Sequence, residues 1–241
     1  GGDGTLHAAN KVAEQGIKIV AIPKTIDNDV AGTDLSIGFH TAVNIATEAI
    51  DRIHTTAESH NRVMVVEVMG RHAGWIAVNA GIAGGAELVL APEEPFDMDR
   101  IVKFLKHRHR SHANFSIVVV AEGALPKEGS SMQYEAQLGK FGEIVAGAIG
   151  ERVANEIATR TGFDTRLMIL GHVQRGGTPT PTDRILGSRF GVAAVDAVSR
   201  GETNVMTALR NEEVVLVPLE EIAGKVKHVP DDLLRVARVL A

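Results

Sequence analysis

The chain has 241 residues, 44% of them hydrophobic, which is enough for one large domain or two smaller ones with apolar cores. Its formal net charge of -5 gives no general attraction for nucleic acid or an anionic membrane, so we expect neither as a partner. No apolar run approaches the roughly 18 residues that cross a bilayer, and the sequence contains no cysteine for disulfides or thiolate metal sites. These features predict a cytoplasmic protein.

Short apolar runs alternate along the chain with longer segments of helical periodicity. The apolar runs predict buried strands at 17–23, 62–70, 86–92, 114–123, 165–172 and 213–218. The periodic segments predict helices at 40–57, 97–110, 140–162 and 181–201, with another directly after GGDGT at the start. Residues 125–137 lack any period and predict an exposed, mobile loop. This alternation is typical of an α/β fold with mainly parallel sheets.

Four of the predicted strands are followed by loops that combine glycine with charged residues. The loop sequences are KTIDNDVAGTD, MGRHAGW, EG and GHVQRGG. Ligands bind beyond the carboxyl ends of strands in open α/β sheets, so these loops are candidates for a binding site. Each alone could be an ordinary polar connection, but four together favour a functional site.

The opening sequence GGDGT predicts a turn that leads into a helix. Glycine at positions 1, 2 and 4 would let backbone amides approach an anion, and the start of the helix adds a partial positive charge. Asp3 would repel a bare phosphate but could hold Mg²⁺. The alternative is a tight turn that only caps the helix.

The segment PKTIDND places Asp27 and Asp29 two residues apart, so an extended chain would direct both carboxylates to one face. Two close carboxylates raise the pKa of one of them, which suits a general base. Thr25 would share this face and could orient a phosphate. The alternative is a turn whose acidic side chains point into water.

Arginine residues flank several of the predicted strand ends, and guanidinium groups bind phosphate with two parallel hydrogen bonds. They are Arg62, Arg71, Arg166 and Arg175, with His172 three residues before the last. The cluster KHRHRSH at 106–112 could suggest a metal site, but it ends a helix, where cations are favoured, and has no accompanying acids.

Taken together, GGDGT, PKTIDND, MGRHAGW, AEG and GHVQRGGTPTPTDR resemble, in order and spacing, the phosphofructokinase family over nearly the whole chain. The resemblance implies a glycolytic kinase that phosphorylates the 1-hydroxyl of fructose 6-phosphate. It also implies two Rossmann-like α/β/α domains with the active site in the cleft between them. The donor-binding domain would comprise 1–38 and 174–223, and the sugar-phosphate-binding domain 39–173 and 224–241.

The resemblance further implies a role for each motif residue. Asp27 would be the catalytic base, with Thr25, Asp29 and Arg71 as its catalytic partners. The residues expected to contact the sugar phosphate are Thr25, Asp27, Met69, Gly70, Arg71, Glu122, His172 and Arg175. Arg62 and Arg166 would reach the 6-phosphate from a neighbouring subunit, so a homo-oligomer, a dimer or tetramer, is expected. The donor would be bound by Gly2, Asp3, Gly4, Thr5 and Lys24, with Asp3 as the Mg²⁺ ligand.

The phosphoryl donor is predicted from two positions. In this family, glycine at position 4 accompanies ATP, whereas an aspartate there would crowd the α-phosphate and accompanies pyrophosphate. Lys24 is more usual in pyrophosphate-dependent members. Because a carboxylate would exclude ATP while a lysine tolerates either donor, we predict ATP and keep pyrophosphate as the alternative.

Two further alternatives differ in class. A catalytically silent sugar-phosphate sensor could use the same fold. Diacylglycerol and NAD kinases share GGDGT but lack PKTIDND and GHVQRGG. Family members also carry a glycine-rich segment before GGDGT, and we expect residues 1–241 alone to bind the donor poorly or to misfold.

Overall fold

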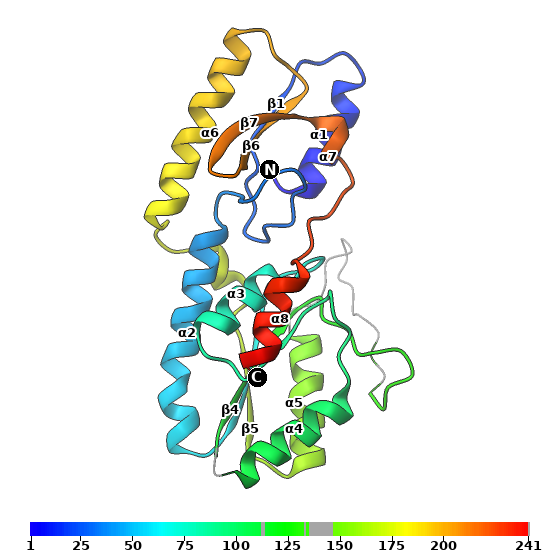
Figure 1. Cartoon of the computed structure of the whole chain (residues 1–241), viewed down its shortest axis with the longest axis vertical. Helices are drawn as coiled ribbons and strands as arrows, with labels where there is room; N and C mark the ends of the chain where they lie inside the picture. The colour runs from blue at the N-terminus through cyan, green and yellow to red at the C-terminus, as the bar shows by residue number, and fades with distance from the viewer. Residues whose placement is uncertain (112–113, 133, 135–146, 241) are drawn as a thin grey trace. The chain divides into compact units, whose positions relative to one another are not determined.

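The computed structural model describes residues 1–111, 114–132, 134 and 147–240 (Figure 1). The chain divides into two compact units, Gly1–Ala42 with Gly177–Lys227 and Val43–Gly176 with His228–Ala241. The first boundary lies within helix α2 (Phe39–Ser59), whose buried positions follow the helical period predicted for 40–57. Helices and strands alternate through both units, so the predicted α/β class is confirmed.

The first unit contains a sheet of three strands in the order β1-β6-β7. These strands are β1 (Val20–Ala21), β6 (Val205–Arg210) and β7 (Glu213–Pro218). β1 runs parallel to β6, whereas β6 and β7 are antiparallel and joined by Asn211 and Glu212, both with positive φ. Two such residues form the tight turn that matches the twist of a hairpin. β6 was not predicted, while β7 has the predicted bounds.

Helices cover both faces of this sheet (Figure 1). Helix α1 (Asp3–Ala13) and the short α7 (Leu219–Ile222) bury Leu6 and Leu219 against one face. Helix α6 (Pro181–Ser199) buries Phe190 against the other. The unit therefore has an apolar core on each side of its sheet.

The second unit contains a sheet of four parallel strands in the order β3-β4-β2-β5. Their bounds are β2 (Val63–Val68), β3 (Leu88–Leu90), β4 (Ser116–Ala121) and β5 (Thr165–Ile169). Val63 pairs with Ser116 of β4 and with Thr165 of β5, so these three strands begin level with one another. The two central strands, β2 and β4, are entirely buried and mostly apolar, as expected of a parallel sheet, although β2 also buries Glu67.

Successive residues of β4 face opposite layers of helices, as the pleat of a strand requires. Val118 and Val120 join a core with α4 (Met98–Arg110) and α5 (Ala148–Thr161). Val119 faces α3 (Trp75–Ala83), where a Cβ on Gly81 would lie 3.7 Å from the Val119 side chain. Helix α8 (Asp231–Leu240) packs against α3 through the core that contains Val78 and Leu234.

Several predicted bounds differ from the observed ones. Helices α3 and α8 were not predicted, and most strands stop earlier than the apolar runs do. Residues 171–172 were expected to end a strand, but Gly171–Arg175 forms a 3₁₀ helix instead. Residues 140–146 of the helix predicted for 140–162 lie outside the described ones, and the observed helix α5 begins at Ala148, after the left-handed Gly147. No helix in the described ranges has the length and apolarity needed to cross a bilayer.

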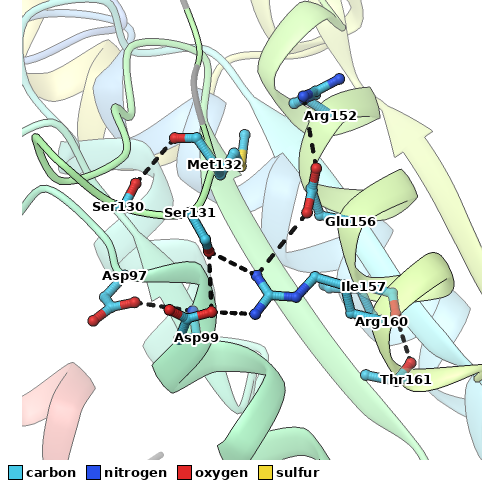
Figure 2. Close-up of polar contacts among 10 residues, drawn as sticks. All are labelled: Asp97, Asp99, Ser130, Ser131, Met132, Arg152, Glu156, Ile157, Arg160 and Thr161. Atoms are coloured by element: carbon cyan, nitrogen blue, oxygen red, sulfur yellow. Dashed lines mark hydrogen bonds and ion pairs between the residues drawn. The ribbon is translucent and has the colours of Figure 1, made fainter.

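The segment 125–132 was expected to be exposed, and its described structure corrects this in part (Figure 2). Met132 is only 2% exposed. The Ser131 hydroxyl donates to Asp99 Oδ1 at 3.0 Å, and Arg160 Nη1 donates to Ser131 Oγ at 3.0 Å. Arg160 also pairs directly with Asp99, so the segment is tied to α4 and α5. Most of 133–137 lies outside the described residues.

Candidate functional site

The first set of predicted site residues lies in the acid loop, which we define as residues 24–36, after β1. The Lys24 N–H donates to the Gly1 carbonyl at 3.0 Å, and a Cβ on Gly2 would lie 3.2 Å from Thr25 Cβ. The turn before α1 and the acid loop are therefore in contact within the first unit. This brings the predicted donor residues next to the predicted catalytic ones.

Asn28 gives the acid loop its shape. It is 1% exposed and has a left-handed φ of 52°, a conformation that asparagine tolerates. Its side-chain oxygen accepts from the Ser36 N–H at 3.0 Å, and the Ser36 hydroxyl donates to the Thr25 carbonyl at 2.7 Å. The expectation of an extended chain through Asp27 and Asp29 is therefore wrong, because the backbone turns at the residue between them.

Thr25 and Asp27 nevertheless face one another, as expected. The Thr25 hydroxyl donates to Asp27 Oδ2 at 3.3 Å, and the Asp27 N–H donates to the same hydroxyl at 3.3 Å. The Asp27 side chain is half-buried, which leaves its carboxylate reachable by a ligand. This pair can accept a proton from a hydroxyl group that binds beside it.

Asp29 is the most strongly perturbed carboxylate of the loop. It is 6% exposed, and burial raises its pKa to about 6, with further increases from the charges of Asp27 and Asp3. The positive charge of Lys227 acts in the opposite direction. Asp29 Oδ1 has no hydrogen-bond partner within the described part of the chain. Three carboxylates therefore repel one another across this loop and the start of α1.

The carboxylates fit the Mg²⁺ ion that the family resemblance implies. Carboxylate oxygens are the side-chain ligands that Mg²⁺ prefers, and a cation would reduce the repulsion that raises the pKa of Asp29. Asp3 lies in the first turn of α1 and is the residue that would hold the ion. Among residues 1–111, 114–132, 134 and 147–240, no three His, Asp or Glu side chains are arranged as a metal site.

Two glycines of GGDGT differ in what the fold requires of them. A Cβ on Gly1 would lie 2.4 Å from the Thr5 side chain, so this position has no room for a larger residue. A Cβ on Gly4 would have no atom within 4 Å, and Gly4 is exposed. Packing therefore does not explain glycine at position 4. Gly2 supplies no side chain to cap α1, so the first amides of the helix are available to an anion.

The second set of predicted site residues lies at the carboxyl ends of β4, β2 and β5 in the second unit. The Met69 N–H donates to Gln174 Oε1 at 3.2 Å, and the Gly70 N–H donates to Glu122 Oε1 at 3.4 Å. The Gly123 N–H donates to the Gly70 carbonyl at 3.1 Å. Loops that follow three adjacent strands are thus joined at one edge of the sheet.

Glycine is required where these loops meet. Gly70 has a φ of 132°, and a Cβ there would lie 2.7 Å from the Ala73 carbonyl oxygen. A Cβ on Gly123 would lie 2.0 Å from the Arg71 carbonyl oxygen. Any side chain at either position would force the two backbones apart and move Arg71.

The 3₁₀ helix Gly171–Arg175 separates the roles of the GHVQR residues. Three residues per turn place His172 and Arg175 on one side, and both are exposed. Gln174 is 1% exposed, and its amide nitrogen donates to the Gly171 carbonyl at 3.0 Å. Sequence reasoning missed Gln174, although it is the polar residue between the two expected ligand-binding residues of the motif. It connects this helix to Met69.

Asp183 is a second buried residue that sequence reasoning missed. It is 3% exposed and accepts from the N–H groups of Gly38 at 2.9 Å and Thr41 at 2.8 Å. One carboxylate in the first turn of α6 therefore holds the start of α2, which follows the acid loop. The only sequence signal was its place at the end of GHVQRGGTPTPTDR.

Arg62 and Arg166 lie at the opposite edge of the sheet from Arg71. Arg62 precedes β2, and Arg166 is the second residue of β5. Asp164 joins them, with Arg62 Nε at 2.6 Å and Arg166 Nη2 at 3.0 Å. The hydrogen bond from Arg62 lowers the pKa of Asp164, and the charge of Arg166 lowers it further. The six residues of β2 separate these edges by about 20 Å, so Arg62 and Arg71 of one chain cannot bind the same phosphate.

The charge on Asp29 is expected to lower the stability of the fold at neutral pH. The pKa of Asp29 is raised from 3.8 to about 6, so the folded protein holds the Asp29 proton more tightly than the unfolded chain does. The stability gained from this protonation is complete below pH 3.8 and is lost as the pH rises through 6. We predict that Asp29→Asn increases the free energy of unfolding by about 2 kcal/mol at pH 8 and by little at pH 4. Urea unfolding in metal-free buffer measures this, with Asp51→Asn on the exposed face of α2 as control. An unchanged midpoint at pH 8 would contradict the prediction.

Comparison with known proteins identifies the family. The family model for phosphofructokinase matches residues 1–198. The chain is 51% identical over 230 residues to an ATP-dependent 6-phosphofructokinase of Corynebacterium efficiens. The aligned region covers 95% of this chain and 66% of the relative. It is also 51% identical over 240 residues to a pyrophosphate–fructose 6-phosphate 1-phosphotransferase of Amycolatopsis methanolica. This alignment covers 99% of this chain and 70% of the relative.

Solved structures of phosphofructokinases also resemble this chain. A pyrophosphate-dependent phosphofructokinase of Nitrosospira multiformis matches with a TM-score of 0.83 at 25% identity, over 100% of this chain and 65% of that one. Phosphofructokinase of Saccharomyces cerevisiae matches with a TM-score of 0.76 at 32% identity, over 91% of this chain and 31% of the yeast chain. The chain spans about two thirds of the length of the curated relatives it matches. From its motifs, its fold and these matches, the chain belongs to the phosphofructokinase family.

Proposed function

We propose that this protein transfers the γ-phosphoryl group of ATP to the 1-hydroxyl of fructose 6-phosphate and forms fructose 1,6-bisphosphate in glycolysis, in the cytoplasm. The observation that carries the proposal is the contact between the acid loop, with its Thr25–Asp27 pair, and the uncapped start of α1. A proton acceptor and an anion-binding helix terminus are the two parts that phosphoryl transfer to a hydroxyl needs. The Corynebacterium efficiens relative carries the name of this activity.

Asp27 is the base in this proposal. Its half-buried carboxylate accepts the proton of the sugar hydroxyl as the hydroxyl oxygen attacks the γ-phosphorus, and the bond from this phosphorus to the β–γ bridging oxygen breaks to release ADP. The Thr25 hydroxyl, which donates to Asp27 at 3.3 Å, orients the carboxylate, and Asp29 adds negative charge beside it. The exposed Arg71 stabilises charge on the equatorial oxygens of the transferred group.

The donor phosphates bind at the start of α1, where Gly2, Gly4 and Thr5 present backbone amides. Asp3 would hold Mg²⁺, which would supply positive charge to neutralise the donor phosphates. The sugar phosphate binds in the second unit, at the edge that carries Met69–Arg71 and Glu122, together with the exposed His172 and Arg175. The first unit is thus assigned to the donor and the second to the sugar phosphate.

ATP is favoured as donor because Gly4 leaves open space beside the start of α1. The fold itself does not require glycine there, so the small residue is available for a functional reason. Pyrophosphate remains the second candidate, since Lys24 is exposed beside the same turn and the Amycolatopsis methanolica relative is named for pyrophosphate. The equal identities to relatives of both kinds do not discriminate between the donors.

Arg62 and Arg166 are proposed to bind the 6-phosphate of a sugar held by a neighbouring subunit. Their position at the amino edge of the sheet, about 20 Å from Arg71, supports this because they cannot serve the site of their own chain. The protein would then be a homo-oligomer, a dimer or tetramer.

Removal of the base tests the mechanism. We predict that Asp27→Ser lowers kcat by 10²–10⁴-fold, the usual worth of general base catalysis, while KM for fructose 6-phosphate changes far less. Steady-state kinetics of the purified protein measures both, with Asp51→Ser as the control. Retention of more than about a tenth of the turnover would remove Asp27 from the role of base.

Replacement of Gly4 tests the donor. Because a side chain at this position meets no protein atom, Gly4→Asp should fold normally. It should lower kcat/KM for ATP by about 100-fold, because the carboxylate crowds and repels the α-phosphate, and should affect pyrophosphate less, because pyrophosphate has no third phosphate. Gly4→Asn has the same size without the charge and should lie between the two. A parent protein that prefers pyrophosphate would overturn the choice of ATP.

Mixing two inactive variants tests the shared site. Arg166→Ala chains keep Asp27, and Asp27→Ser chains keep Arg166, so an oligomer that contains both can form a complete site. After joint refolding, activity should rise well above the mean of the separate variants. Activity that never exceeds this mean would show that each chain uses its own Arg166.

A further inference from the structure

Residues 226–227 run beside the acid loop, although 190 or more residues separate them in sequence. Val226 pairs with Val30 in an antiparallel bridge, and the Lys227 N–H donates to the Asp29 carbonyl at 2.8 Å. All of these residues belong to the first unit. The backbone of the acid loop is therefore held by a segment that none of the family motifs includes.

The side chain of Lys227 makes a second attachment to the same loop. Its Nζ donates to the Thr33 carbonyl at 2.9 Å and to the Asp34 carbonyl at 2.8 Å. One residue thus contacts both ends of the segment 29–34, at Asp29 through its backbone and at Thr33 and Asp34 through its ammonium group.

The charges that face this ammonium group are mostly negative. Asp34 and Asp29 act directly on Lys227, and Asp29 is in turn influenced by Asp27 and by Asp3 of α1. Arg210 at the end of β6 is the neighbouring cation, and its Nε donates to the Gly32 carbonyl at 2.9 Å. Burial lowers the pKa of Lys227 to about 8, against the opposite effect of the two carboxylates.

A buried ammonium group is costly unless anionic or carbonyl oxygens compensate for the lost water. An apolar residue of similar length would fill the same space without that cost. It would, however, leave the Thr33 and Asp34 carbonyls without this donor, and it would remove the positive charge that acts on Asp29, whose Oδ1 has no hydrogen-bond partner among the described residues.

We propose that Lys227 is a positioning residue for phosphoryl transfer, whose ammonium group holds the Thr33–Asp34 carbonyls and stabilises ionised Asp29 beside the base Asp27. This inference rests on the proposed function, because it takes Asp27 as the base. Lys227 acts through the acid loop, with no contact to substrate required.

The kinetic test compares Lys227→Met, which removes the charge, with Lys227→Arg, which keeps it and can still donate to two carbonyls. We expect Lys227→Met to lower kcat about tenfold at pH 7 with KM for fructose 6-phosphate within about twofold. Loss of a cation raises the pKa of nearby carboxylates, so the acidic limb of the kcat profile should move up by about one pH unit. Lys227→Arg should restore both values, and Lys225→Met, an exposed lysine of the same segment, should change neither.

A merely structural lysine would give a different result. Lys227→Met would then lower the unfolding midpoint but leave the acidic limb in place, and that outcome would overturn the proposal. Should Lys227→Met fold poorly, the double variant with Asp29→Asn provides a second test. If Lys227 balances the charge on Asp29, Asp29→Asn should raise the urea midpoint more in the Lys227→Met background than in the parent. Equal gains in both backgrounds would contradict the inference.

These tests also separate this inference from the proposed function. A parent protein with kinase activity whose Lys227→Met variant keeps its kcat and pH profile would refute the role of Lys227 alone. A parent protein without kinase activity would refute the proposed function, and the urea comparison would still decide whether Lys227 and Asp29 form a coupled pair.

Discussion

The parallel pairing of β2 with β4 on one side and β5 on the other is the constraint on which the residues proposed to bind the sugar phosphate depend. Because the three strands begin level and run in one direction, the loops that follow them emerge at the same edge. Gly123 and Arg71 are in such close backbone contact that each loop fixes the other. The arrangement is thus a property of the sheet as a whole, and a slip of one strand by one residue would separate the loops that carry Arg71, Glu122 and Arg175.

The acid loop follows the opposite principle, since it concentrates charges that the fold must then accommodate. Asp29 and Lys227 are both withdrawn from water, and both have pKa values shifted toward the neutral form. Buried Asn28 and Ser36 hold the loop with neutral hydrogen bonds, and the Lys227 ammonium group adds charged ones to the Thr33 and Asp34 carbonyls. A loop of this kind sacrifices stability for a preorganised, charged site, as functional sites commonly do.

Sequence patterns predicted the helices, strands and motifs that are determined by residues close together in the chain. Helix 40–57 was found because its apolar residues repeat at the helical interval, strand 213–218 because it is a continuous apolar run, and the family motifs because they are contiguous. Helix α3 was missed because WIAVNAGIA is apolar on nearly all sides and so has no polar face to mark its period. Gln174 and Asp183 were missed for a different reason. Their partners lie 105 and 142 residues away, so only the folded chain shows what they hold.

The pairing of Arg62 and Arg166 through Asp164 has a consequence for how such a protein behaves as an assembly. Asp164 holds the two arginines together at the edge of the sheet away from Arg71, and the proposal above assigns both arginines to a sugar phosphate bound by a neighbouring subunit. In the arrangement proposed above, each bound sugar phosphate would contact two subunits at once. Each bound sugar phosphate would strengthen the oligomer, and dilution would diminish substrate affinity while every chain remained folded.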